Sequence, residues 1–281
     1  MIKLNTPVLV SRLPVQIGLD DRITVLGSCF ADSMGQKLLD AGFDVCVNPF
    51  GTLYNPVSIC NAVARLSGGR PFSEGDCVEM GAGAGLVCSF SHHTSFARKS
   101  AGEFLSNANS ALSKAADFWK SSNKVIVTLG TAMVWKLVSN GEVVANCLKR
   151  PAGEFSHEML GVAQVSALLD LLVKGNPDKE FIFTVSPIRH LGDGAHGNTL
   201  SKATLQLALA RTGACYFPAS EILLDELRDY RFYADDLCHP SRLAEDIIWQ
   251  RFLDSAVIAG DLSQIVLNEK AARQKAHRPL R

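Results

Sequence analysis

Near its N-terminus the chain reads Arg22-Ile23-Thr24-Val25-Leu26-Gly27-Ser28-Cys29-Phe30-Ala31. The first five residues are mostly β-branched or apolar, and they predict a buried strand. Gly27 allows a tight turn without a Cβ clash. The small and apolar residues from 31 to 41 predict a helix that ends at Gly42. A strand that passes directly into a helix is the first half of a βαβ unit.

The same alternation of strand and helix continues along the chain. The patterns predict further strands at 43–47, 124–129, 180–185 and 214–217, a hairpin over 134–145, and further helices at 56–66, 103–119, 162–173, 200–211 and 241–258. This alternation predicts an α/β fold with a mainly parallel sheet covered by helices on both faces. We expect one domain over 1–281, with an irregular excursion near 68–99 and a basic C-terminal tail at 264–281.

The composition argues against several classes of protein. The 281 residues carry 28 Lys+Arg and 28 Asp+Glu, so the formal charge is zero and a generally basic nucleic-acid binder is not expected. Neither a secretion signal nor a run of membrane-spanning length is visible, which predicts a cytoplasmic protein without a membrane span. The eight cysteines contain no CxxC pair, so we expect neither a disulfide framework nor a structural zinc site.

Cys29 is the first candidate catalytic residue. It follows the turn at Gly27, near the N-terminus of the predicted helix, where the positive end of the helix dipole favours a thiolate. Because ligands of such folds gather at the carboxyl ends of the strands, this is also the edge where a reactive group is expected. The alternative is that Ser28 caps the helix and Cys29 packs beneath it.

A second candidate lies near the other end, in Asp236-Leu237-Cys238-His239-Pro240. An Asp three residues before a His can accept a hydrogen bond from imidazole Nδ1 and leave Nε2 facing a nucleophile. The spacing alone also occurs by chance. Its place just before the last predicted helix favours the functional reading, since there the chain returns to the ligand edge of the sheet.

Several unusual sequence motifs occur in order along the chain, and together they resemble those of a known family. They are Gly27-Ser28-Cys29-Phe30-Ala31, Asn48-Pro49-Phe50-Gly51, Ser91-His92-His93, Leu129-Gly130-Thr131-Ala132, Thr184-Val185-Ser186-Pro187-Ile188-Arg189-His190 and the block from Leu227 to His239. Over roughly residues 20–255 the chain resembles the GSCFA-domain family. That family is similar to the SGNH/GDSL hydrolases, which implies a flavodoxin-like three-layer α/β/α fold and ester or acyl chemistry.

The resemblance also implies roles for the two candidates. Where GDSL enzymes read Gly-Asp-Ser with a serine nucleophile, this chain has Gly27-Ser28-Cys29, which places Cys29 at the nucleophile position and leaves Ser28 as the alternative. Asp236 and His239 match the late Asp-x-x-His block. A thiol nucleophile with this pair is chemically sound, since an ionised Cys attacks acyl carbons well.

The oxyanion donors are less clearly marked. Gly51 resembles the second-block glycine and offers a backbone N–H, while Thr131 offers its hydroxyl where the family block usually carries an Asn. Asn55 and Asn146 are alternatives for the same role. Leu148 stands where the family often has a His, so we expect no essential imidazole there.

Three other features of the sequence have both a functional and a structural interpretation. Arg189 and His190 follow a predicted strand and either clamp an anionic group or hold their loop. His92 and His93 are candidates for a pocket rim rather than a metal site, because no third ligand has metal spacing. The GxGxxG word at 192–197 does not directly follow a strand, so it predicts a flexible flap rather than a nucleotide site.

Three functions remain open from the sequence. The first is an acyl-ester or thioester hydrolase that acts on a small-molecule or carbohydrate ester through a Cys (or Ser)-His-Asp triad, without a cofactor or metal. The second is an acyltransferase to a carbohydrate or other hydroxyl, with Arg189 and the basic tail binding a CoA-type donor. The third is a non-catalytic binding module that keeps the fold.

Overall fold

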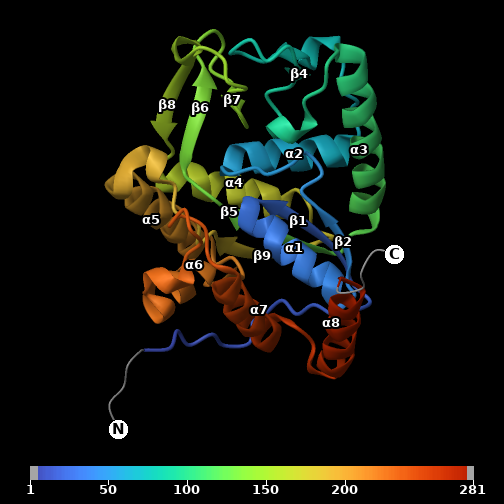
Figure 1. Cartoon of the computed structure of the whole chain (residues 1–281), viewed down its shortest axis with the longest axis vertical. Coiled ribbons are helices and arrows are strands. Elements are labelled where there is room, and N and C mark those ends of the chain that lie inside the picture. The colour runs from blue at the N-terminus through green and yellow to red at the C-terminus, as the bar shows by residue number, and fades with distance from the viewer. Residues whose placement is uncertain (1–5, 277–281) are drawn as a thin grey trace.

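The computed structural model describes residues 6–276, and its centre is a five-stranded sheet (Figure 1). The sheet contains β1 (Arg22–Gly27), β2 (Asp44–Val47), β5 (Lys124–Leu129), β9 (Glu180–Val185) and β10 (Tyr216–Phe217). Every pairing in it is parallel, and the strand order is β10-β9-β5-β1-β2. Counted by appearance along the chain this is 2-1-3-4-5, the flavodoxin-like order. The expected α/β fold with a parallel sheet is confirmed.

Helices cover both faces of this sheet. One face carries α2 (Pro56–Gly68), α3 (Ala101–Ser121), α4 (Val162–Lys174) and α5 (Gly194–Thr212). The other face carries α1 (Cys29–Ala41), α6 (Ala219–Glu221), α7 (Arg242–Ala256) and α8 (Leu262–Ala276). Each face has its own hydrophobic cluster, so the molecule has three layers.

The strand residues divide between these two clusters in strict alternation. Val125, Val127 and Leu129 of β5 pack into the cluster under α2 and α3, whereas Ile126 packs against α1 and α7. Successive side chains of a strand point to opposite faces. A strand buried on both faces therefore has a mainly apolar sequence, and β5, which is apolar except for Lys124 and Thr128, is of this kind.

A second group of strands lies over α2, at the end of the molecule away from α7 and α8 (Figure 1). It consists of the antiparallel sheet β6 (Met133–Leu137), β7 (Val143–Val144) and β8 (Phe155–Met159), and of the hairpin β3 (Val78–Glu79) and β4 (Val87–Cys88). The predicted irregular excursion contains that hairpin and two short 3-10 helices, η1 (Glu74–Asp76) and η2 (Thr94–Phe96).

Three elements differ from the predictions. α7, expected to be the terminal helix, is followed by α8, which contains the described part of the basic tail; that tail was expected to be helical at first, and its residues 277–281 lie outside the described residues. β8 was not expected. α5 begins at Gly194, so the GxGxxG segment forms a 3-10 turn, η4 (Leu191–Asp193), and the start of a helix rather than a loop. Within residues 6–276, no helix is long and apolar enough to cross a membrane.

Candidate functional site

The turn after β1 requires a glycine. Gly27 has φ +144°, and a Cβ atom there would lie 2.2 Å from the backbone oxygen of Thr128. The Gly27 N–H donates to Asn48 Oδ1 at 2.8 Å, which fixes the loop after β2 to the end of β1. β1 lies between β5 and β2, at the point where the order of strands along the sheet reverses. Cys29, the first residue of α1, therefore lies at the switch point where such folds bind ligands.

The two candidate nucleophiles have very different surroundings. Ser28 is fully buried, and its hydroxyl donates to Ser186 Oγ at 3.0 Å. Cys29 is partly exposed, and its sulfur lies 3.3 Å from the hydroxyl of Tyr54. Ser28 occupies the N-cap position of α1 but makes no capping hydrogen bond with its side chain. A substrate can thus reach the sulfur of Cys29, while the Ser28 hydroxyl is enclosed and engaged elsewhere.

Tyr54 is a site residue that the sequence did not reveal. Thr52 Oγ1 donates to the Tyr54 hydroxyl at 3.1 Å, so the phenolic proton is available to the sulfur of Cys29. Burial, together with the hydrogen bond to Cys29, raises the pKa of Tyr54 to about 12. The phenol therefore stays protonated at neutral pH and can donate to the sulfur. The only indication of this role in the sequence was the position of Tyr54 in the loop after β2, at the carboxyl edge of the sheet.

Tyr54→Phe is expected to slow alkylation of Cys29 by iodoacetamide about tenfold at neutral pH, because a hydrogen bond to a charged group contributes roughly 1.5–3 kcal/mol. Peptide mass spectrometry after timed labelling measures the rate at Cys29 alone. Tyr230→Phe, an equivalent change at an exposed tyrosine, should leave the rate as it is. An unaltered rate in Tyr54→Phe would show that the phenol does not assist the thiolate.

The Asp236–His239 pair lies in the turn between η6 (Tyr230–Phe232) and α7. His239 Nδ1 is 2.5 Å from Asp236 Oδ2, while Asp236 Oδ1 accepts the N–H groups of Cys238 and His239, each at 2.9 Å. These two backbone bonds, followed by the imidazole contact, lower the pKa of Asp236 to about 2. The carboxylate is therefore ionised and orients the imidazole with Nε2 free.

Arg189 and His190 join this turn to the Cys29 region. Arg189 donates its backbone N–H to the Cys238 carbonyl and its guanidinium to the Leu237 carbonyl, both at 3.0 Å. The ring of the next residue, His190, packs edge-on against Tyr54 with centroids 5.7 Å apart. Cys29 and His239 thus belong to one edge of the molecule. No hydrogen bond joins them directly among the described residues.

His190 is a neutral histidine at physiological pH. Burial, and then the positive charges of Lys202 and His239, lower its pKa to about 4. Its Nε2 atom is buried and has no hydrogen-bond partner within residues 6–276. His190 therefore contributes packing against Tyr54, and a weak base, rather than a cation.

A buried lysine lies beneath this edge. Lys202, on α5, is 7% exposed and donates Nζ to the carbonyls of Gly130 and Ser186 at 2.6 and 2.8 Å. These carbonyls follow β5 and β9, and burial lowers the pKa of Lys202 to about 7. The signal in the sequence was its spacing, because Lys202 precedes the buried Leu205 and Leu209 by three and seven residues and so shares their helix face.

A model of the GSCFA family matches residues 22–252. The chain belongs to the GSCFA family. No curated protein matches the sequence.

Two of the expected oxyanion donors, Gly51 and Asn55, support the loop after β2. Gly51 has φ +77°, and its N–H donates to the Asn48 carbonyl at 2.8 Å. Asn55 is the N-cap of α2, where its side-chain oxygen accepts the Ser58 N–H at 2.9 Å. The Gly51 N–H, which was expected to face an oxyanion, is therefore engaged within the protein, and so is the side-chain oxygen of Asn55.

Of the other two expected donors, Thr131 is engaged through its hydroxyl and Asn146 through its side-chain oxygen. The Thr131 hydroxyl is 2.8 Å from Ser201 Oγ and accepts the Met133 N–H at 3.0 Å. Asn146 lies in the loop after β7, where its side-chain oxygen accepts the Leu148 N–H at 2.8 Å. This loop belongs to the strands above α2 rather than to the carboxyl edge of the five-stranded sheet.

The adjacent histidines of the GSCFA motif at 91–93 pack and hydrogen-bond within the protein. His92 is fully buried among phenylalanine rings, with Nδ1 2.7 Å from Ser89 Oγ, and burial lowers its pKa to about 3. His93 caps η2 by accepting the Ser95 N–H. No cluster of three or more potential metal ligands occurs within residues 6–276.

Proposed function

We propose that the protein is an acyl-ester or thioester hydrolase in which Cys29 is the nucleophile and His239, oriented by Asp236, is the general base. The observation that carries the proposal is the contrast at the switch point of the sheet. There the sulfur of Cys29 is partly exposed and contacts a phenol, while the neighbouring Ser28 hydroxyl is buried. The oriented imidazole on the same edge supplies the base.

The reaction proceeds in two halves. His239 Nε2 accepts the Cys29 thiol proton, and the thiolate attacks the acyl carbonyl carbon, forming a C–S bond and a tetrahedral oxyanion. N–H groups of the first turn of α1, which lacks a side-chain cap, stabilise that oxyanion. The intermediate collapses, and the leaving alcohol or thiol takes the proton from His239. His239 then deprotonates a water molecule, which attacks the acyl group and releases the acid and the Cys29 thiol.

The proposal requires His239 to approach Cys29 when substrate binds. The imidazole lies on an exposed turn, and catalytic hydrogen bonds of free enzymes often form only in the complex. Arg189 holds the turn through two carbonyls, so its guanidinium acts within the protein. The acyltransferase alternative, which needs Arg189 to bind a CoA-type donor, therefore has less support.

His239→Gln is expected to lower kcat/KM for p-nitrophenyl acetate by about 10²–10⁴-fold, the usual contribution of a general base. Stopped-time absorbance of the released p-nitrophenol measures it. His196→Gln, at an exposed histidine of α5, is the matched control and should retain the activity. Full activity in His239→Gln would exclude this residue as the base and make His190 the next candidate.

A further inference from the structure

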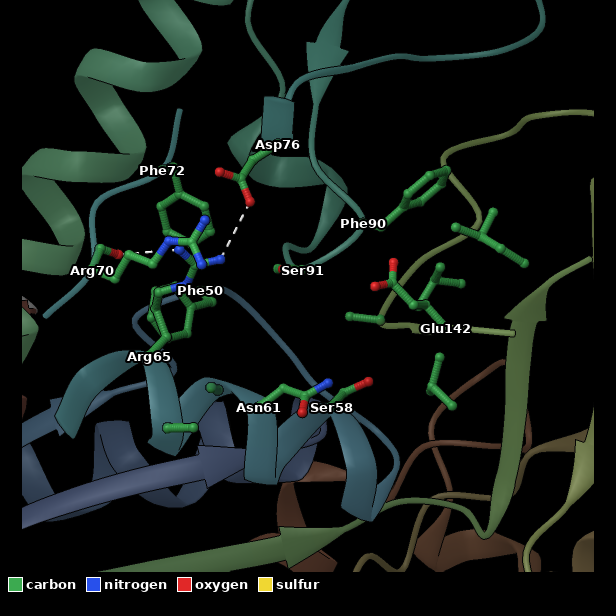
Figure 2. Close-up of a pocket in the computed structure, with 16 residues that line it drawn as sticks. Phe50, Ser58, Asn61, Arg65, Arg70, Phe72, Asp76, Phe90, Ser91 and Glu142 are labelled. Atoms are coloured by element: carbon green, nitrogen blue, oxygen red, sulfur yellow. Dashed lines mark hydrogen bonds and ion pairs between the residues drawn. The ribbon is translucent and has the colours of Figure 1, made fainter. Parts of the chain in front are cut away.

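A cleft of about 480 Å³ lies on the other side of α2 from the strands of the central sheet, and none of the catalytic candidates lines it. It opens between α2, the segment from 70 to 76 and the strand β7 (Figure 2). Its volume lies in the lower part of the range for small-molecule sites. We propose that this cleft is a binding site for a saccharide of one or two rings. The proposal does not depend on the hydrolase activity.

The floor of the cleft is one face of α2. Ser58, Asn61 and Arg65 are spaced by three and four residues, so they line up along the helix. Figure 2 shows Ser58 and Asn61 at the base of the cleft and Arg65 at one side of it. Ser58 is only 5% exposed, and its hydroxyl has no hydrogen-bond partner in the described part of the chain. Leaving a buried hydroxyl unpaired costs free energy, so a ligand hydroxyl is its natural partner.

The walls combine aromatic rings with charges that cancel. On one side the Arg65 guanidinium pairs with Asp76 at 3.3 Å and lies 4.2 Å from the centre of the Phe72 ring. Phe90 and Glu142 face them from the other side (Figure 2). The Arg65 guanidinium pairs with Asp76. At the opposite wall the Glu142 carboxylate accepts an N–H of the Asn140 side-chain amide and can also accept a hydrogen bond from a ligand.

These surroundings match the two kinds of surface on a sugar. A sugar ring has hydroxyl donors and acceptors around its edge and apolar C–H groups on its faces. Hydroxyl, amide, guanidinium and carboxylate groups can satisfy the edge, while the partly exposed ring of Phe90 can cover a face. Because Arg65 and Arg70 balance Asp76 and Glu142, the cleft has no net charge, and a neutral polyhydroxylated ligand fits it better than a phosphate or a cation.

Saturation-transfer NMR with glucose, N-acetylglucosamine, glucuronate and maltose at millimolar concentration tests the proposal. At least one of these sugars should bind, and Ser58→Ala should weaken binding about tenfold through one lost hydrogen bond. In the free protein the same change should leave the melting temperature equal or higher, because it removes an unpaired buried hydroxyl. Ser166→Ala, at a serine of α4 that is 6% exposed, is the matched control and should bind normally.

A second variant blocks the cleft without disturbing the core. Asn61 is exposed, so Asn61→Trp should fold normally and abolish the sugar signal, whereas Ser106→Trp on the exposed face of α3 should not. The proposal is overturned if none of the four sugars binds. It is also overturned if Asn61→Trp binds as well as the wild type, or if free glycine binds the cleft and the sugars do not.

Discussion

Cys29→Ala is expected to remove p-nitrophenyl acetate hydrolysis almost completely, by at least about 10³-fold, because it deletes the only atom that forms the covalent bond. Ser28→Ala should keep most of the activity. Its hydroxyl is fully buried against Ser186, so the change costs about 1 kcal/mol of stability through one lost hydrogen bond and leaves the Cys29 sulfur in place.

Two measurements distinguish chemistry from folding. Circular dichroism confirms that each variant is folded, and peptide mass spectrometry of the quenched reaction locates the acyl group. Cys60→Ala is a suitable control, since burial raises the pKa of that thiol to about 11 and keeps it protonated. An acyl adduct on Cys29, and none in Cys29→Ala, is the expected pattern. If Cys29→Ala turns over the ester as fast as the wild type, thiol catalysis is excluded.

The layered architecture was predictable because its causes are local. The run at 124–129 has four apolar residues out of six, with only Lys124 and Thr128 polar, which predicts a strand buried on both faces. The glycine at position 27 marks the turn into α1. The contact between Asp236 and His239 could be predicted from the sequence because the two residues are three positions apart in one turn. In each case the interacting residues are close in sequence.

The contacts that surround Cys29 were not predictable in the same way. Tyr54 meets the sulfur only because Asn48 fixes the loop after β2 to β1, a contact across 21 residues. Among the expected oxyanion donors, Gly51, Asn55 and Asn146 bond to residues two or three positions away. Thr131 instead contacts Ser201, which lies 70 positions along the chain. Hydrogen-bond partners chosen by tertiary packing leave no pattern in the sequence.

Lys202→Met is expected to abolish a rise in stability with pH that the wild type shows between pH 7 and 8.5. Burial lowers the pKa of Lys202 to about 7 in the folded protein, whereas an unfolded lysine titrates near 10.4. In this window the unfolded chain therefore binds more protons than the native one, and the free energy of unfolding increases with pH. Integrated from pH 7 to 8.5, the gain is about 1.5 kcal/mol.

The window must end near pH 8.5 because the thiols act in the opposite direction. Burial raises the pKa values of Cys46 and Cys60 to about 11. Above pH 8.5 these thiols therefore stay protonated in the native state, while in the unfolded chain they lose their protons. Urea unfolding at pH 6, 7, 7.75 and 8.5 measures the slope, with Lys114→Met, at an exposed lysine of α3, as the control that should keep it.

The same variant tests how the edge beneath Cys29 is held together. Methionine fills the space of the lysine stem but cannot donate to the carbonyls of Gly130 and Ser186, which then lose a buried partner at a cost of about 1–3 kcal/mol each. The difference in stability between wild type and Lys202→Met should therefore be larger at pH 8.5 than at pH 6, since only at low pH does the wild type bear the cost of a buried charge. A difference that does not change with pH would mean that Lys202 keeps its proton throughout and that its two carbonyl partners compensate for burial.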